Sequence, residues 1–363
     1  IGVLNLKKIL VIAEKPSVAQ DIAKVLECKK KGEGYFYSER YIVSWAIGHL
    51  ISLCDPEDYD VKLKSWQFNT LPIIPDTIKL KATKKTKAQL NILKKLMNSK
   101  DVEKIICATD SGREGELIFR YIYQFVKCKK EFQRLWISSM TNTAIKNGFE
   151  NLKPSKEYDN LFYSAKCRSE ADWIVGINAT RAYTLKYNTL LSIGRVQTPT
   201  LSIIVNRYKE IENFKPEKYY ELKLKYKDFD ALWIDLKTKS SKLLKDKAEK
   251  IENKIKNKSV SVHSVKLEEK QQVPPLLYDL TELQRDCNKK FGYSAQKTLN
   301  IAQNLYEKRK LITYPRTDSQ YLSSDMIPNL KFILNRISID KYKEYINNLE
   351  NLHITKRIVD NSK

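Results

Sequence analysis

The sequence predicts a multidomain protein that combines an α/β domain with α+β segments, and three observations lead to this prediction. The chain has 363 residues, whereas a single hydrophobic core rarely grows beyond about 250–300 residues. Two strand-loop-helix units occur near its start, as a parallel α/β sheet requires. Helical and strand-like patterns then follow in separate zones. Because 42% of the residues are hydrophobic, the chain can fill several cores.

Residues 1–150 are predicted to form the α/β domain. The run "KKILVIA" predicts a buried strand that ends near Ala13, and Pro16 is typical of the first turn of a helix. The segment "EKIICATDSGREGELIFRYIYQFV" repeats this plan from residue 103. In open parallel sheets, ligands bind outside the carboxyl ends of the strands. We therefore expect the functional residues in the loops that follow the two strands.

Three further zones follow the α/β domain. Residues 151–215 have a helical pattern. Residues 216–275 alternate as strands do in "EKYYELKLKYKDFDALWIDL" and "NKSVSVHSVKLEEKQQV", with a Lys-rich segment between them. Residues 276–363 turn helical again and contain the stretch "LITYPRTDS".

The charge balance indicates a polyanionic partner. Lys and Arg number 66 against 43 Asp and Glu, which gives a formal net charge of +23. Nucleic acid is favoured over a membrane, since no apolar stretch approaches the ~20 residues that span a bilayer. Six scattered cysteines form no C-x-x-C pair, which argues against a zinc ribbon and gives no disulfide framework. We expect a cytoplasmic protein without a signal peptide or membrane anchor.

Acidic residues follow both predicted strands. If the two loops lie side by side, Glu14, Asp110 and Glu114 converge, and three carboxylates suit Mg²⁺, which pairs with phosphates. Lys15 and Arg113 add positive charge beside them, as a phosphodiester site requires. The alternative is that the acids of the second loop only stabilise the N-terminus of a helix.

Other phosphate chemistries lack their motifs. No glycine is followed by lysine, so the G-x-x-x-x-G-K-[ST] phosphate loop is absent and we expect no ATP site. The three histidines, His49, His263 and His353, are not spaced as a metal pair or as H-x-x-R. A histidine-dependent nuclease and a tyrosine recombinase are therefore not supported.

Two stretches in the helical zone are candidate phosphate contacts. In "SIGRVQTPTL", Thr198 and Pro199 resemble an N-cap and a first helical residue. The preceding loop, with Arg195 and Gln197, would then present a phosphate to a helix N-terminus. An ordinary capped helix with a solvated arginine is the alternative. In "CRSEAD", Arg168 and Asp172 share one helical face, where a surface ion pair is the simpler interpretation.

Tyr314 has an unusual setting in "LITYPRTDS". Its neighbours are polar or conformationally fixed rather than apolar on a helical or strand period. Pro315 biases the residue before it away from helix. Tyr314 is therefore either a turn residue or a nucleophile that projects into a cleft.

Together the motifs resemble one family. "VIAEKPSVAQ", "ATDSGREGELIFR", "ADWIVGINATRA", "SIGRVQTPTL" and "ITYPRTDSQYL" are similar to the ordered motifs of type IA DNA topoisomerases, in the bacterial topoisomerase III branch. The resemblance runs from about residue 8 to the last residues. It implies a Toprim domain at 1–150, followed by the first parts of a helical domain at 151–215 and of a β-rich arch at 216–275. Residues 276–363 would be the helical domain that carries the nucleophile of an incomplete toroid.

The resemblance also implies roles for individual residues. Tyr314 would attack single-stranded DNA to form a 5′-phosphotyrosine, helped by Arg316 and Lys15, with Glu14 as the acid for the leaving 3′-oxygen. Mg²⁺ would be held by Glu14, Asp110 and Glu114. The phosphotyrosine stores the energy of the broken bond, so no ATP is needed, and we expect a monomer. The implied DNA contacts are His49, Arg113, Arg168, Asp172, Ser192, Ile193, Gly194, Arg195, Val196, Gln197 and Arg316.

Two departures from the family pattern affect these expectations. The acidic triplet of the family commonly reads D-x-D-x-E, but Gly112 occupies the middle position, so we expect fewer protein ligands on the metal. Family members are also longer, and they carry another active-site histidine in the part that follows. The alternative is therefore a truncated DNA-binding fragment without catalysis. A primase or nuclease that uses the acids alone would leave Tyr314 and Arg316 without a role.

Overall fold

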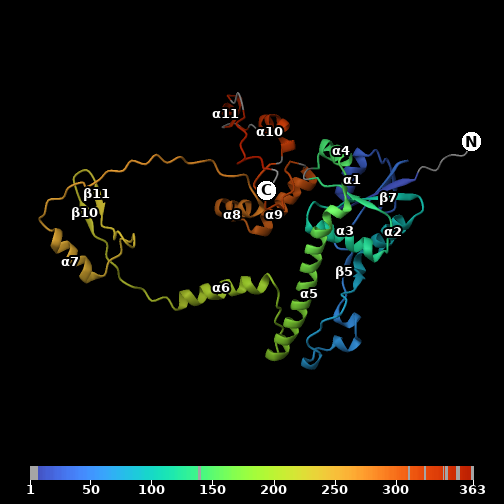
Figure 1. Ribbon diagram of the computed structural model, residues 1–363, viewed down its shortest axis with the longest axis horizontal. Helices are drawn as coiled ribbons and strands as arrows, with labels where there is room; N and C mark the ends of the chain where they lie inside the picture. Colours follow the sequence, from blue (N-terminus) through green and yellow to red (C-terminus); the bar gives the residue numbers. More distant parts are fainter. Residues whose placement is uncertain are drawn as a thin grey trace, which may run out of the picture. The chain divides into compact units, whose positions relative to one another are not determined.

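The computed structural model describes two compact units. The described residues are 7–137, 140–309, 311–322, 324–337, 339, 342–348 and 352–360. The first unit comprises residues 1–195 and 275–363, and the second comprises residues 196–274. Figure 1 traces the elements of both. The four domain ranges expected from the sequence stay predictions.

A seven-stranded sheet forms the centre of the first unit. Its strand order is β2-β3-β4-β1-β7-β8-β9, and β4, β1, β7 and β8 run parallel. The strands are β1 (Lys8–Ala13), β2 (Lys30–Gly32), β3 (Tyr35–Tyr37), β4 (Tyr41–Trp45), β7 (Val102–Ala108), β8 (Phe132–Arg134) and β9 (Lys153–Pro154). The two buried strands predicted from the sequence are confirmed as β1 and β7.

Helices cover both faces of this sheet. On one face lie α1 (Pro16–Val25) and α4 (Asn142–Glu150), packed against Val11 and Ala13 of β1. On the other face lie α2 (Lys87–Asn98), α3 (Arg113–Phe125) and the first turns of α5 (Asp159–Tyr187), packed against Leu10 and Ile12. Because β1 is buried on both faces, it reads as a continuous apolar run and not as an alternating one.

The register of β1 and β7 brings two loops together. Ala13 of β1 pairs with Ala108 of β7, and both strands end there. Glu14 directly follows β1, and Thr109 directly follows β7. The loops that carry Glu14 and Asp110 therefore leave the same edge of the sheet side by side.

A long excursion between β4 and α2 is held by helix α5. It contains β5 (Ile51–Leu53), β6 (Leu80–Ala82) and the short helices η1 (Pro56–Asp58), η2 (Val61–Lys64), η3 (Phe68–Thr70) and η4 (Lys84–Thr86). Trp173 Nε1 donates to the Cys54 carbonyl at 2.9 Å, and the buried Arg181 donates to the Leu63 carbonyl at 2.6 Å. These bonds fix one side of the excursion along α5.

The last part of the first unit is a set of short helices. They are α8 (Leu280–Phe291), α9 (Ala295–Asn304), the π-helical turn η6 (Leu305–Arg309), η7 (Ser324–Asn329), α10 (Leu330–Ile337) and α11 (Lys343–Asn347); η5 (Ser155–Tyr158) precedes α5. Asp279 and Ser294 cap α8 and α9 through their side chains. Tyr314 lies in the irregular segment after η6. The Leu280 amide donates to the Thr317 carbonyl at 3.1 Å, which ties this segment to the start of α8.

The second unit corrects two expectations. It contains α6 (Gln197–Glu212), β10 (Lys223–Lys225), β11 (Asp230–Leu232) and α7 (Lys245–Ile255). The strand expected at 257–273 is wrong: the segment has no strand and its side chains are exposed, because alternation alone gives a strand no partner to bond. Helix α6 begins at Gln197, so Thr198 is not its cap. Pro199 is tolerated in the first turn, where backbone amides have no intrahelical acceptor.

No helix in the described residues is both long and apolar enough to cross a membrane.

Candidate active site

Glu14 and Asp110 meet where β1 and β7 end. The Asp110 amide donates to Glu14 Oε2 at 3.2 Å. Burial, and then the charge of Asp110, raise the pKa of Glu14 to about 7, although Lys15 and His49 oppose the shift. A carboxyl group with a pKa near neutrality can give or take a proton under physiological conditions.

Tyr314 joins this pair from a distant part of the sequence. Its hydroxyl donates a hydrogen bond to the Asp110 side chain. Burial raises the pKa of the phenol, the charges of Asp110 and Glu14 raise it further, and Arg316 lowers it. The buried ring of Tyr306 in η6 lies edge-on to the Tyr314 ring, with centroids 5.5 Å apart and an interplanar angle of 71°. The phenol is therefore oriented toward the acids and not toward solvent.

The loop that carries Asp110 packs tightly onto helix α3. A Cβ atom at Gly115 would lie 2.2 Å from the Asp110 carbonyl oxygen, so only glycine allows this approach. The Thr109 hydroxyl donates to the Gly115 carbonyl at 2.8 Å. Gly112, by contrast, has extended backbone, and a Cβ atom added there would meet no other atom within 4 Å.

The three expected metal ligands do not form one cluster. Among the described residues, no group of three or more His, Cys, Asp or Glu side chains is arranged to hold a metal ion. Glu14 and Asp110 are adjacent, and the buried Asp110 Oδ2 has no hydrogen-bond partner. Glu114 instead lies 2.8 Å from His49. The donor set near Asp110 fits a hydrated Mg²⁺ with two protein carboxylates, since this ion keeps several waters.

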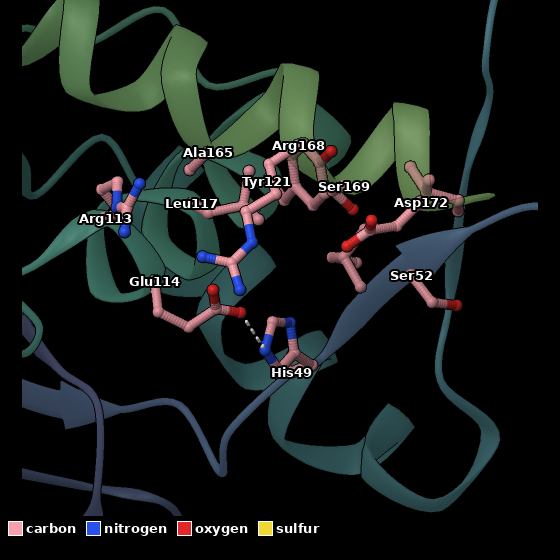
Figure 2. Close-up of a pocket in the computed structure, with 12 residues that line it drawn as sticks. His49, Ser52, Arg113, Glu114, Leu117, Tyr121, Ala165, Arg168, Ser169 and Asp172 are labelled. Carbon is pink, nitrogen blue, oxygen red and sulfur yellow. Dashed lines mark ion pairs between the residues drawn. The ribbon is translucent and has the colours of Figure 1, made fainter. Parts of the chain in front are cut away.

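A pocket of about 330 Å³ is lined by Glu114 and gathers several predicted DNA contacts. Figure 2 shows Glu114 of α3 and His49 pointing toward each other on one side, with Arg113 and Arg168 near them. The hydrogen bond to Glu114 raises the pKa of His49, although burial opposes it, and the same bond lowers the pKa of Glu114. The full lining is His49, Ile51, Ser52, Leu53, Arg113, Glu114, Leu117, Tyr121, Ala165, Arg168, Ser169 and Asp172.

Asp172 pairs with a residue other than the one its spacing suggested. Arg195 donates from Nε to Asp172 Oδ1 at 2.7 Å and from Nη2 to Oδ2 at 3.3 Å. This forked contact lowers the pKa of Asp172, and the charge of Arg168 contributes less. The simple ion pair between Arg168 and Asp172 is therefore wrong, because the loop after α5 returns Arg195 to the same face.

The loop from Ser192 to Arg195 is anchored on α5. The Ile193 amide donates to the Thr180 hydroxyl at 3.0 Å. Ser192, Ile193 and Gly194 thus hold Arg195 toward Asp172. Val196 and Gln197 begin the other compact unit.

Sequence reasoning missed some residues of the site. Ser52, Tyr121 and Ser169 also line the pocket. Ser169 precedes Asp172 by three positions on a helix, so helical spacing was a usable signal for it. Ser52 carries no such signal, because only the β5–β6 pairing brings it here.

The chain is similar to known proteins along most of its length. The family model described as DNA topoisomerase matches residues 156–363, and the Toprim domain model matches residues 9–140. DNA topoisomerase 3 of Bacillus cereus (strain ATCC 14579) is 49% identical over 361 residues, which cover 99% of this chain and 50% of that protein. DNA topoisomerase 3 of Bacillus subtilis (strain 168) is 48% identical, over 95% of this chain and 48% of that protein.

A solved structure is also similar. Full-length topoisomerase I from Thermotoga maritima matches with a TM-score of 0.64 and 26% sequence identity, over 90% of this chain and 52% of that one. The chain spans about half the length of the curated relatives it matches.

Proposed function

Because the chain belongs to the DNA topoisomerase family, in its type IA topoisomerase III branch, we propose that it breaks and rejoins single-stranded DNA at Tyr314. The observation that carries this proposal is the contact between the Tyr314 hydroxyl and Asp110, next to Glu14. Both acids raise the pKa of this half-buried phenol, so they keep it protonated until a phosphate and its positively charged partners are in place. The arrangement suits a nucleophile that must lose its proton when a phosphate arrives.

The cleavage step balances with residues of this site. The Tyr314 oxygen forms a bond to phosphorus and loses its proton to Asp110, while the bond from phosphorus to the 3′-oxygen breaks. Protonated Glu14, with a pKa of about 7, gives its proton to the leaving 3′-oxygen. The strand is then attached through a 5′-phosphotyrosine. Rejoining reverses each transfer, so no ATP is consumed.

Positive charge is available for the transferring phosphate. Arg316 acts on Tyr314, and Lys15 acts on Glu14, as their effects on the two pKa values indicate. An arginine can hold a phosphate through two parallel hydrogen bonds. We therefore assign Arg316 and Lys15 to charge stabilisation during the transfer.

Mg²⁺ would be held by Glu14 and Asp110. When bound, the ion would supply positive charge to the phosphate oxygens. Glu114 stays a predicted ligand, because it contacts His49 in this structure. The unpartnered Asp110 Oδ2 is the feature that favours a cation here.

The DNA strand adjacent to the scissile phosphate is proposed to enter the pocket beside α3 and α5. Arg113 and Arg168 bring positive charge to it, and the formal charge of +23 favours DNA overall. Arg195 and Asp172 add a fixed polar pair at the rim. The remaining predicted DNA contacts are Ser192, Ile193, Gly194, Val196 and Gln197. The monomeric state and the cytoplasmic location also stay predictions.

The experiment is covalent capture of DNA. Single-stranded oligonucleotides labelled at the 5′ or the 3′ end are incubated with the protein and then denatured. We expect a protein-DNA adduct that keeps only the 3′ label, because Tyr314 would be joined to the 5′ phosphate of the downstream fragment. Binding without any adduct would favour the alternative, a DNA-binding fragment that does not cleave. An adduct that keeps the 5′ label would contradict the proposed polarity.

A further inference from the structure

Arg134 is a fully buried arginine that lies behind the loop between β7 and α3, residues 109–112, here called the catalytic loop. It is the last residue of β8, and its side chain is 0% exposed. Its Nη1 donates to the carbonyls of Thr109 at 2.7 Å, Leu135 at 2.9 Å and Cys107 at 3.2 Å, and its Nη2 donates to the Asp110 carbonyl at 2.7 Å. Three of these four acceptors belong to the end of β7 and the loop after it.

The Asp110 carbonyl is held from two sides. It accepts from Arg134 Nη2 and also from the Gly112 amide at 2.9 Å. Helix α3 closes the other side, because Gly115 approaches this oxygen so closely that a Cβ would lie 2.2 Å away. The backbone of Asp110 therefore has little freedom, and its carboxylate stays directed at Tyr314 while its amide stays on Glu14.

A buried acid keeps Arg134 in place. Glu116 of α3 is 0% exposed, and its Oε2 lies 3.1 Å from Arg134 Nε. Arg120 contacts the other oxygen at 2.8 Å and also pairs with Asp159 at 2.8 Å, at the start of α5. Buried ion pairs are seldom more stable than apolar side chains of the same volume. A guanidinium fork that reaches four carbonyls has a geometric role that an apolar residue cannot fill.

We infer that Arg134 is a positioning residue for Asp110: it fixes the backbone of the catalytic loop so that Asp110 meets both Glu14 and Tyr314. Arg134 itself touches no reacting atom. The inference rests on the proposed function for its catalytic consequence, but the fixing of the loop is a property of the protein alone.

The decisive variant is Arg134→Lys, which keeps the positive charge opposite Glu116 but cannot bond several carbonyls at once. Hydrogen exchange of the 109–116 segment is measured in the full chain without DNA. We expect the Asp110 amide to exchange at least about tenfold faster than in the wild type, while β1 exchanges as before. Unchanged exchange at Asp110 in folded Arg134→Lys would overturn the inference.

The matched control is Phe119→Leu. Phe119 is a fully buried residue of α3, and the centroid of its ring lies 4.9 Å from that of Phe132. Truncating Phe119 therefore weakens the packing of α3 on the sheet without touching the Asp110 carbonyl. It should leave the Asp110 amide protected. Faster exchange at Asp110 in Phe119→Leu would mean that general loosening, and not Arg134, controls the loop.

Single-turnover cleavage then tests the catalytic consequence. We expect Arg134→Lys to lower the maximal cleavage rate about 10–100-fold with little change in the oligonucleotide concentration that gives half of that rate, and Phe119→Leu to stay within about threefold of the wild type. If the wild type cleaves nothing, the proposed function fails while hydrogen exchange still decides the positioning role. If the wild type cleaves and Arg134→Lys cleaves equally well, the catalytic part of the inference is wrong.

Discussion

The hydroxyl group of Tyr314 donates a hydrogen bond to the carboxylate of Asp110, although the two residues are far apart in the sequence. Strand register brings Asp110 next to Glu14, and the segment after η6 brings the phenol to both. The contact gives the nucleophile an immediate proton acceptor.

Asp110→Asn should remove that acceptor. The side chain keeps its size but loses its charge, so proton transfer from Tyr314 becomes unfavourable. We expect single-turnover cleavage to fall by about 10²-fold or more, with unchanged affinity for the oligonucleotide in EDTA. Asp101→Asn, at an exposed turn, is the control and should cleave as the wild type does. Normal cleavage by Asp110→Asn would remove Asp110 from the proton path.

Gly115→Ala should disturb the site through the backbone. The added methyl group would lie 2.2 Å from the Asp110 carbonyl oxygen, so the loop or the helix must move. We expect a loss of about 1–3 kcal/mol of stability and a reduced cleavage rate, read from thermal melts and adduct formation. Gly112→Ala is the matched control, since a Cβ there meets nothing within 4 Å. Equal thermal stability and equal cleavage rates of Gly115→Ala and Gly112→Ala would contradict the tight packing described for Gly115.

Gly112→Asp should restore a third carboxylate near the metal site. The backbone of Gly112 is extended and the position is open, and aspartate is a good helix N-cap there. We expect rejoining to reach half of its maximal rate at about tenfold lower Mg²⁺ concentration. Gly112→Asn, which is nearly the same size and uncharged, should change this midpoint far less. An unchanged midpoint in Gly112→Asp would place the ion elsewhere.

Glu14→Gln should change how stability depends on pH. The pKa of Glu14 is raised from 4.5 to about 7 by burial and by Asp110, so the protonated form is the one that the fold favours. Its contribution is fully present below pH 4.5 and is lost as the pH rises through about 7. In EDTA, we expect the free energy of unfolding of the wild type to fall by about 1–3 kcal/mol relative to Glu14→Gln as the pH rises from 4.5 to about 7.

The measurement is a series of thermal melts between pH 4.5 and 8. Exposed Glu39 provides the control, and Glu39→Gln should follow the wild-type curve. Asp110, Lys15 and His49 are the charged neighbours of Glu14, and all three are retained in both variants. Parallel curves for wild type and Glu14→Gln would contradict a raised pKa at this site.

The sequence predicted the strands and loops that form the site, for a physical reason. Buried parallel strands such as β1 are uninterrupted apolar runs, and Pro16 identifies the helix that follows. Glu14 and Asp110 could therefore be assigned to one sheet edge before their contact was known. The family resemblance, and not periodicity, supplied the role of Tyr314.

Other features could not be predicted because they depend on tertiary contacts. Arg134 looks like a surface arginine in "EFQRLW", and only the fold shows it to be buried against Glu116. The partner of Asp172 is Arg195 rather than Arg168. The loop after α5 brings Arg195 back to Asp172, and helical spacing does not reveal such a contact. The strand expected at 257–273 failed because alternation does not reveal whether a partner strand exists.

Covalent capture with two tyrosine variants tests most directly whether Tyr314 is the nucleophile. Tyr314→Phe removes the proposed nucleophile, and Tyr306→Phe changes the neighbouring buried tyrosine by the same single oxygen. We predict that the wild type and Tyr306→Phe form a 3′-labelled adduct with single-stranded DNA, and that Tyr314→Phe binds the DNA but forms none. An adduct of wild-type yield with Tyr314→Phe would contradict the assignment of Tyr314 as the nucleophile.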